Sequence, residues 1–248
     1  MFNFLSRKVI SHTYIRIPFL QIKSAIDLKY SNQLKKITSQ KCSIIGREKY
    51  LNSAVLIPLV IFDGIEYLLF EKRSLLVRQP GEISFPGGHF DGRTDCDFSE
   101  TAIRETCEEL GISKNKIDLI SSLGTLVAPM GVIVETYIGL IKISSIDELN
   151  IDKKEVDRIF LLPLQHFVDT KPDEYFTRLE LHSFIINEKG EKEEFLPVKE
   201  LGLPEQYALP WRGGKHRVLV YKTDEEIIWG ITAELIYELT KKLKEQID

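Results

Sequence analysis

Three glutamates at helical spacing carry the clearest chemical signal in the chain. Glu105, Glu108 and Glu109 lie within five residues of one another, and at about 100° per residue they fall on one side of a helix. The apolar residues Cys107 and Leu110 fall on the opposite side, so such a helix can pack on a core and present its carboxylates to a cleft. Like charges one turn apart repel each other, and a hard cation such as Mg²⁺, which chooses carboxylate and phosphate oxygen, relieves that repulsion. The pattern therefore predicts a metal site for phosphate chemistry.

The residues that flank these glutamates fit the two ends of a helix and a turn before it. Asp97 is a predicted N-cap with Glu100 three residues on, and Gly111 is a predicted stop after the last turn. Gly87 and Gly88 allow a tight turn whose backbone approaches metal or phosphate, although a plain strand-to-loop turn would use the same residues. Glutamate runs on helices are more often solvated faces, and the flanking residues favour the metal site here.

The segment from Arg104 to Ile112 resembles the second half of the Nudix box, written G-x5-E-x7-R-E-U-x-E-E-x-G-U with U apolar. The matching residues are Arg104, Glu105, Glu108, Glu109, Gly111 and Ile112. The first half differs, because the residue eight positions before Arg104 is Cys96 instead of glutamate, and the box glycine would fall on Phe90. The loop thus resembles a form two residues longer than the standard one, and we expect Cys96 to take no part in metal binding.

The sequence before the box is similar to one branch of this family. Residues 68–74 and 78–88 resemble the extra signature of the coenzyme A pyrophosphatases, approximately L-L-x-x-R-S, L-R and G-x-x-x-F-P-G-G, with Val77 in place of the usual leucine. The resemblance covers roughly residues 34–248. It implies an α/β fold, a Nudix-type α/β/α sandwich with a mixed central sheet, preceded by an N-terminal extension at 1–33.

The resemblance also implies roles for individual acidic and basic side chains. The three implied ligands of Mg²⁺ or Mn²⁺ are Glu105, Glu108 and Glu109. Arg104 is expected to orient these carboxylates through a bidentate pair without touching substrate. Glu155 occupies the position of a recurrent acidic residue in the branch and is the best candidate for a general base, with an exposed glutamate at a strand start as the alternative. Asp91 and Asp95, in the enlarged loop, are weaker candidates that can equally well be turn formers.

Positive side chains that could bind a phosphorylated substrate occur in two stretches of the sequence, residues 73–78 and 212–217. The predicted substrate-binding residues, besides Gly87 and Gly88, are Arg73, Arg78, Arg212, Lys215 and Arg217. Guanidinium groups fit phosphate well, and coenzyme A carries a 3′-phosphate in addition to its diphosphate. Taken singly, each of these residues is also compatible with an ordinary surface charge.

Composition limits the class of protein. The 248 residues carry a net charge of −4 and a pI near 5.8, which argues against a broad nucleic-acid footprint. Three cysteines without metal-ligand spacing suit a reducing compartment, no apolar run approaches the ~20 residues that span a bilayer, and no secretory signal is recognisable. We therefore expect a cytoplasmic protein that acts on a small nucleotide-type molecule, with a homodimer left open.

Hydrophobic periodicity and turn residues predict alternating strands and helices. Strands are expected at 54–62 and 66–72, joined by an Asp63-Gly64 hairpin turn. The remaining expected elements are helices at 31–38, after Pro163 and at 229–244, and strands at 118–127, 132–143, 156–162, 179–186, 193–198 and 217–222.

Three functions stay open at this stage. The first is cleavage of coenzyme A or acyl-coenzyme A to 3′,5′-ADP and (acyl-)4′-phosphopantetheine, as the resemblance implies. The second keeps the chemistry but takes ADP-ribose, NADH or another nucleoside diphosphate. The third is a non-catalytic Nudix-fold binding or regulatory protein, which the missing box glutamate favours slightly and the complete Arg-Glu…Glu-Glu set disfavours.

Overall fold

The computed structural model describes residues 44–129 and 131–247. The chain divides into two units, Met1–Ile44 and Ile45–Asp248, and the description below concerns the second. The predicted N-terminal extension and the predicted helix at 31–38 lie outside the described residues, and the boundary at residue 34 stays a prediction.

A seven-stranded mixed sheet forms the centre of this unit. Its strands are β1 (Leu51–Phe62), β2 (Ile65–Arg73), β3 (Ile83–Ser84), β4 (Gly87–His89), β5 (Ile117–Ala128), β6 (Val132–Ile141) and β7 (Val156–Pro163). The order is β3-β2-β1-β6-β5, with β4 on β1 and β7 on β2. β1 runs parallel to β6 and antiparallel to β2 and β4. The Asp63-Gly64 turn joins β1 to β2 with positive φ at both residues, as the hairpin signal predicts.

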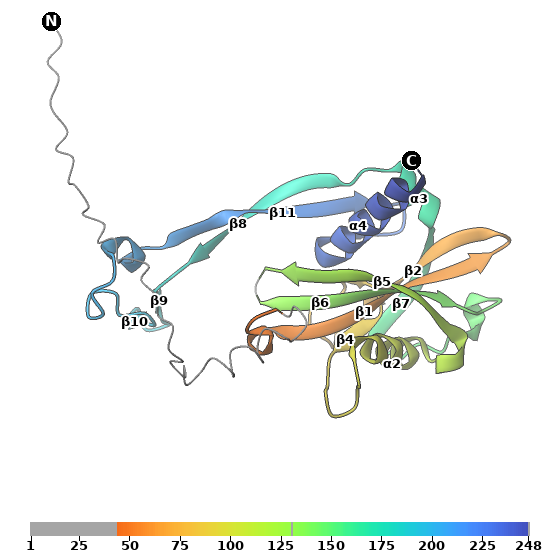
Figure 1. Cartoon of the computed structure of the whole chain (residues 1–248), viewed down its shortest axis with the longest axis horizontal. Coiled ribbons are helices and arrows are strands. Elements are labelled where there is room, and N and C mark those ends of the chain that lie inside the picture. Colours follow the sequence, from red (N-terminus) through yellow and green to blue (C-terminus); the bar gives the residue numbers. More distant parts are fainter. Residues whose placement is uncertain (1–43, 130, 248) are drawn as a thin grey trace, which may run out of the picture. The chain divides into compact units, whose positions relative to one another are not determined.

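Helices cover both faces of this sheet (Figure 1). They are α2 (Phe98–Leu110), α3 (Leu164–Asp169) and α4 (Gly230–Ile247), with short 3₁₀ turns at Arg47–Lys49, Lys114–Lys116, Ile146–Glu148 and Glu205–Ala208. Leu56 of β1 packs in one core with α2, whereas Ile57, the next residue, packs in a second core with α3 and α4. This alternation places the two cores on opposite faces, so the predicted α/β/α sandwich is confirmed. No helix in the described part of the chain is long and apolar enough to span a membrane.

Both predicted ends of the carboxylate helix α2 are confirmed. The Asp97 side chain accepts hydrogen bonds from the backbone N–H groups of Ser99 and Glu100. At the other end Gly111 adopts φ 65°, and a Cβ there would lie 2.0 Å from the carbonyl oxygen of Asn150. Glycine is therefore required at this position for two reasons, the left-handed backbone and the close approach of the neighbouring chain.

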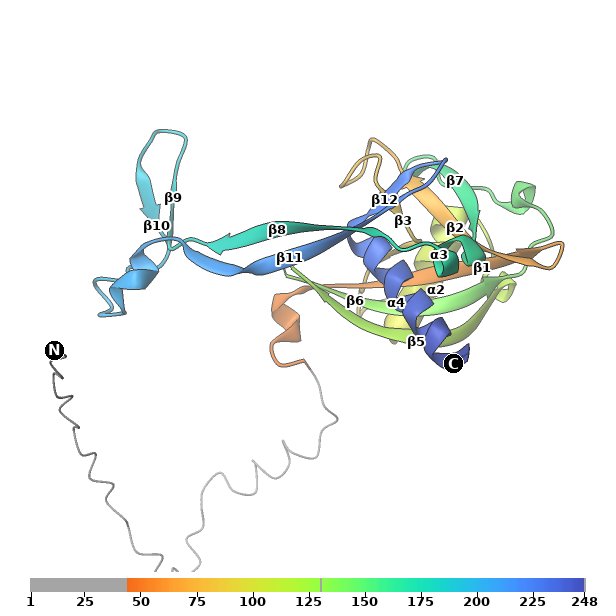
Figure 2. The same cartoon turned by 90° about the horizontal axis from the view of Figure 1, so that it is seen from above.

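The C-terminal half differs from the prediction in its strands. β8 (Asp173–Leu181) and β11 (Trp211–Lys222) form a long antiparallel ribbon with the short β12 (Ile227–Trp229) at its base (Figure 2). The strand expected at 179–186 is two strands, β8 and β9 (Phe184–Ile186), and β9 pairs with β10 (Lys192–Glu194) across the predicted turn. β11 begins six residues before the predicted start, because pairing with β8 accommodates Gly213 and Gly214 in a register shift.

We expect Gly111→Ala to destabilise the protein more than Gly64→Ala. Both glycines have positive φ, so each substitution should cost about 1–2 kcal/mol of backbone strain. A Cβ at Gly64 meets nothing within 4 Å, whereas at Gly111 it meets backbone. Urea unfolding of both variants measures the difference, and equal losses would contradict the steric argument.

Candidate active site

Carboxylates from two elements converge between α2 and the sheet. Glu105 and Glu109 come from α2, and Glu71 comes from β2. Glu71 is 1% exposed and Glu109 is 3% exposed, so the prediction that Glu109 faces a cleft is wrong. Helical periodicity gives the direction of a side chain, whereas its depth depends on the strands that cover it. Glu109 is nevertheless paired, since its Oε2 accepts a 2.9 Å hydrogen bond from the backbone N–H of Gly87.

Two glycines allow close approaches beside these carboxylates. A Cβ on Gly88 would lie 2.3 Å from the carboxyl carbon of Glu105, and a Cβ on Gly87 would lie 2.4 Å from the carbonyl oxygen of Ala54. The predicted tight turn at this point is in fact strand β4, paired with β1. Gly88 therefore leaves room for the Glu105 carboxylate, whereas Gly87 allows β4 to lie close against the backbone of β1. Their contact with substrate stays a prediction.

Burial and mutual repulsion raise the pKa of these acids. The pKa of Glu109 is raised to about 9, first by burial and then by the Glu71 charge. Burial also raises the pKa of Glu71, to about 7, against a hydrogen bond from the Ser84 hydroxyl that lowers it. Burial also raises the pKa of Glu105. Without a counter-charge, the cluster therefore holds protons near neutral pH.

Glu71 is the residue of this cluster to which the sequence assigned no role. Its Oε1 accepts from the Ser84 hydroxyl at 3.1 Å, and its Oε2 is buried without a hydrogen-bond partner among the described residues. The sequence did contain a signal for this residue, since Glu71 directly follows the apolar run Leu68-Leu69-Phe70. A strand that is covered on both faces rarely carries a charge, so a glutamate there indicates a function.

Arg104 ties the long loop to the carboxylate helix. Its Nε and Nη2 donate to both carboxylate oxygens of Asp95 at 2.9 and 3.1 Å, while Nη1 contacts Glu105 at 2.8 Å and Glu108 at 3.1 Å. The expected bidentate pair therefore forms with Asp95, and each glutamate receives a single contact. Asp95 also accepts from the Thr101 hydroxyl, and the Arg104 guanidinium holds its pKa well below the usual range. Asp95 stands next to the position where the Nudix box has glutamate.

The remaining predicted acids lie at the edge of the cluster. Glu155 is exposed, and its charge raises the pKa of both Glu71 and Glu105. Glu108 is 61% exposed and turned toward Arg104. Cys96 is exposed, and its backbone N–H donates to Glu100.

The structure separates the predicted substrate-binding cations. Arg73 lies beside the cluster, where its charge lowers the pKa of Glu71 and Glu109, and its Nε donates to the Arg78 carbonyl oxygen at 2.9 Å. Arg217 pairs with Glu234 of α4 and lies over a tyrosine ring of the same helix. Lys215 lies over the Phe176 ring of β8 at 5.7 Å, and Arg212 is also on β11. Among the predicted cations whose side chains the structure describes, Arg73 is thus the one brought beside the carboxylates.

The donor set fits a hard divalent cation. Within residues 44–129 and 131–247, no three His, Cys, Asp or Glu side chains already converge as a formed metal site. Glu71 has an unpartnered buried oxygen, and the charges of Glu71 and Glu105 raise the pKa of Glu109. A cation of the Mg²⁺ type would satisfy that oxygen and replace the protons. Glu108 would first have to leave Arg104.

Comparison with known proteins identifies the family of the chain. The sequence model of the family described as NUDIX domain matches residues 54–183. The chain belongs to the Nudix family. It is 30% identical over 200 residues to mitochondrial coenzyme A diphosphatase NUDT8 of Mus musculus, covering 79% of this chain and 80% of that protein.

Two further relatives and one solved structure are similar to the chain. Peroxisomal coenzyme A diphosphatase NUDT7 of Mus musculus is 33% identical over 58% of this chain, which spans only 60% of that protein's length. Nudix hydrolase NudL of Photorhabdus laumondii is 28% identical over 78% of this chain and 85% of its own. A MutT/nudix family protein from Enterococcus faecalis aligns with 91% of this chain and 76% of its own, at 13% identity and a TM-score of 0.43.

The raised pKa values predict a pH-dependent stability of the metal-free protein. In the unfolded chain Glu71 and Glu109 have the ordinary pKa of 4.5, and in the folded protein their pKa values are about 7 and about 9. Between the unfolded and folded values the folded state therefore binds more protons than the unfolded state. The free energy of unfolding should therefore fall as the pH rises from about 5 to about 9. Glu109→Gln should flatten this slope, because an amide does not titrate, while Glu108→Gln at the exposed position should keep it. Unfolding in chelator across this range measures both, and an unchanged slope in Glu109→Gln would contradict the assignment.

Asp95→Asn should loosen the anchor of Arg104. Loss of a charged hydrogen-bond partner inside the protein costs about 1.5–3 kcal/mol. The matched control is Asp91→Asn in the same loop, because Asp91 pairs with the exposed Arg93 and should matter less. Thermal and urea unfolding compare the two variants, and a larger loss in Asp91→Asn would be the contrary result.

Proposed function

We propose that this Nudix protein is a divalent-metal-dependent diphosphatase that hydrolyses coenzyme A or acyl-coenzyme A to 3′,5′-ADP and (acyl-)4′-phosphopantetheine. The observation that carries the proposal is the assembly of Glu71, Glu105 and Glu109 against the Gly87-Gly88 backbone. The substrate is supported by the signature before the box and by relatives whose names are coenzyme A diphosphatases.

The proposed reaction assigns each group a separate task. Glu71, Glu105 and Glu109 would hold Mg²⁺ or Mn²⁺, which when bound supplies charge neutralisation and a more acidic water. Arg73, beside the carboxylates, would bind a phosphate oxygen, with Arg78 close by in the next loop. Glu155 is exposed next to Glu71 and Glu105 and would take the proton from the attacking water.

Arg104 has a positioning role in this proposal. Its contacts with Glu105 and Glu108 fix two carboxylates of one helix, and Asp95 fixes Arg104 in turn.

The chain's cytoplasmic location stays a prediction, since the names of its relatives include a mitochondrial and a peroxisomal protein.

A substrate panel tests the proposal. The purified protein with Mg²⁺ should cleave coenzyme A and acetyl-coenzyme A faster than ADP-ribose or NADH, with 3′,5′-ADP as a product seen by chromatography and mass spectrometry. Glu105→Gln should lower turnover on the order of tenfold or more. Glu100→Gln on the same helix is the matched control, because the contacts of this carboxylate are with the Cys96 N–H and Lys114, which lie outside the carboxylate cluster.

Each other outcome of the panel points to a different function. Preferred cleavage of ADP-ribose or NADH would replace the substrate and keep the chemistry. Binding of nucleotides without any turnover would favour a regulatory Nudix protein. Full activity of Glu105→Gln would remove the carboxylate cluster from the mechanism.

A further inference from the structure

Strand β8 forms an open edge of the C-terminal ribbon (Figure 2). The small sheet has the order β12-β11-β8, so among the described strands β8 pairs with β11 along one side and with none along the other. All nine residues of β8 are exposed. An open edge of this length presents backbone N–H and C=O groups that can pair with another strand. Two strands alone are also marginally stable, and further strands stabilise them.

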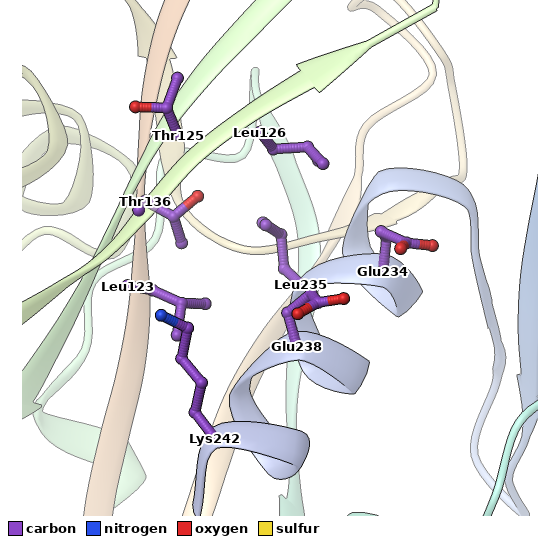
Figure 3. Close-up of a pocket in the computed structure, with 9 residues that line it drawn as sticks. Leu123, Thr125, Leu126, Thr136, Glu234, Leu235, Glu238 and Lys242 are labelled. Atoms are coloured by element: carbon purple, nitrogen blue, oxygen red, sulfur yellow. The ribbon is translucent and has the colours of Figure 1, made fainter.

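The two faces of the ribbon differ, because successive side chains of a strand point to opposite faces. On one face Leu219 of β11 is buried in the core beneath α4, and Arg217 pairs with Glu234 of α4. Glu234 is one of the residues that line the pocket between α4 and the central sheet in Figure 3. The other face carries Leu179 and Leu181, which are 39% and 56% exposed. This apolar face has no cover in the described part of the chain.

The charges next to Leu179 are arranged symmetrically about it. Arg178 and Glu180 flank Leu179, lie 2.9 Å apart and are exposed. In an antiparallel pair of β8 strands with Leu179 opposite Leu179, each Arg178 lies opposite the partner's Glu180. Opposite charges at such cross-strand positions stabilise a sheet. A guanidinium has five N–H donors, so Arg178 can bind both its own Glu180 and the partner's.

Other two-fold registers of β8 match less well. An axis one residue toward the tip places the two Glu180 carboxylates opposite each other, and an axis one residue toward the base does the same to the two Arg178 side chains. An axis two residues toward the base places Glu174 opposite the partner's Glu180. An axis three residues toward the base matches Glu174 with Arg178 but sets Asp173 opposite Leu179. Like charges directly opposite each other destabilise a sheet, so the register with Leu179 on the axis is favoured.

We propose that the protein is a homodimer in which β8 pairs antiparallel with β8 of a second copy, about a two-fold axis at Leu179. The two ribbons then form one continuous sheet in the order β11-β8-β8-β11. Thr177 of each copy lies opposite the partner's Leu181, and two Arg178–Glu180 ion pairs cross the interface. A second copy has this complementary order of charges by symmetry, and two-fold dimers are the commonest protein oligomers.

Sedimentation velocity of the full chain tests the proposed dimer. The parent should sediment as a dimer, with twice the chain mass of 28.6 kDa. Leu179→Lys places two ammonium groups at the axis and should raise the dimer dissociation constant on the order of tenfold or more. Ile65→Lys is the matched control, because Ile65 is an exposed apolar residue of β2, outside the ribbon, and this variant should stay dimeric. A monomeric parent, or a Leu179→Lys dimer as tight as the parent, would overturn the proposal.

Charge reversal tests the pairing of the two copies directly. Arg178→Glu sets glutamate opposite the partner's Glu180, and Glu180→Arg sets arginine opposite the partner's Arg178, so each variant alone should be largely monomeric. An equimolar mixture of the two variants should form a heterodimer, because glutamates of one copy then face arginines of the other. A mixture that stays monomeric while the parent is dimeric would overturn the pairing.

Circular dichroism and thermal unfolding verify that each variant is folded. The charge-reversed pair carries the test if Leu179→Lys does not fold. No substrate enters these measurements, so their outcome is independent of the proposed function.

Discussion

The repulsion among three carboxylates, two of them buried, is the constraint around which the rest of the site is built. Glu71 and Glu109 are buried and Glu105 is half-buried; the Glu105 charge raises the pKa of Glu71, and the Glu71 and Glu105 charges raise the pKa of Glu109. Such a group is stable only when protons, hydrogen-bond donors or cations compensate it. In the metal-free protein the compensation comes from protons and from donors such as the Gly87 N–H. The same need makes the cluster a strong candidate for binding a divalent cation.

Several neighbouring features keep the cluster assembled against this repulsion. The caps of α2 and the packing of Ala102 and Leu110 in its core hold the helix independently of its charges. Arg104, whose guanidinium is paired with Asp95, neutralises part of the charge of Glu105. The chain thus stabilises the scaffold through local caps and apolar contacts, which leaves the acids themselves free for chemistry.

The features that could be predicted from the sequence are those that depend on residues close together in the chain. The limits of α2 depend on Asp97 and Gly111, residues within or beside the helix, so they were predictable. The burial of Glu109 and the participation of Glu71 depend on pairing among β1, β2 and β4, which joins distant segments. The first half of β11 was missed for the same reason, because its glycines favour a turn until β8 supplies a partner strand.

Proton release on metal binding is the most direct measurement of the central claim. Glu109 and Glu71 hold protons near neutral pH, and a cation bound by these carboxylates must displace them. Calorimetric titration of Mn²⁺ at about pH 7, in buffers of different ionisation enthalpy, should show proton release that vanishes near pH 10. Binding of Mn²⁺ without proton release at pH 7 would contradict the account, because the metal would then be held by groups outside the buried cluster.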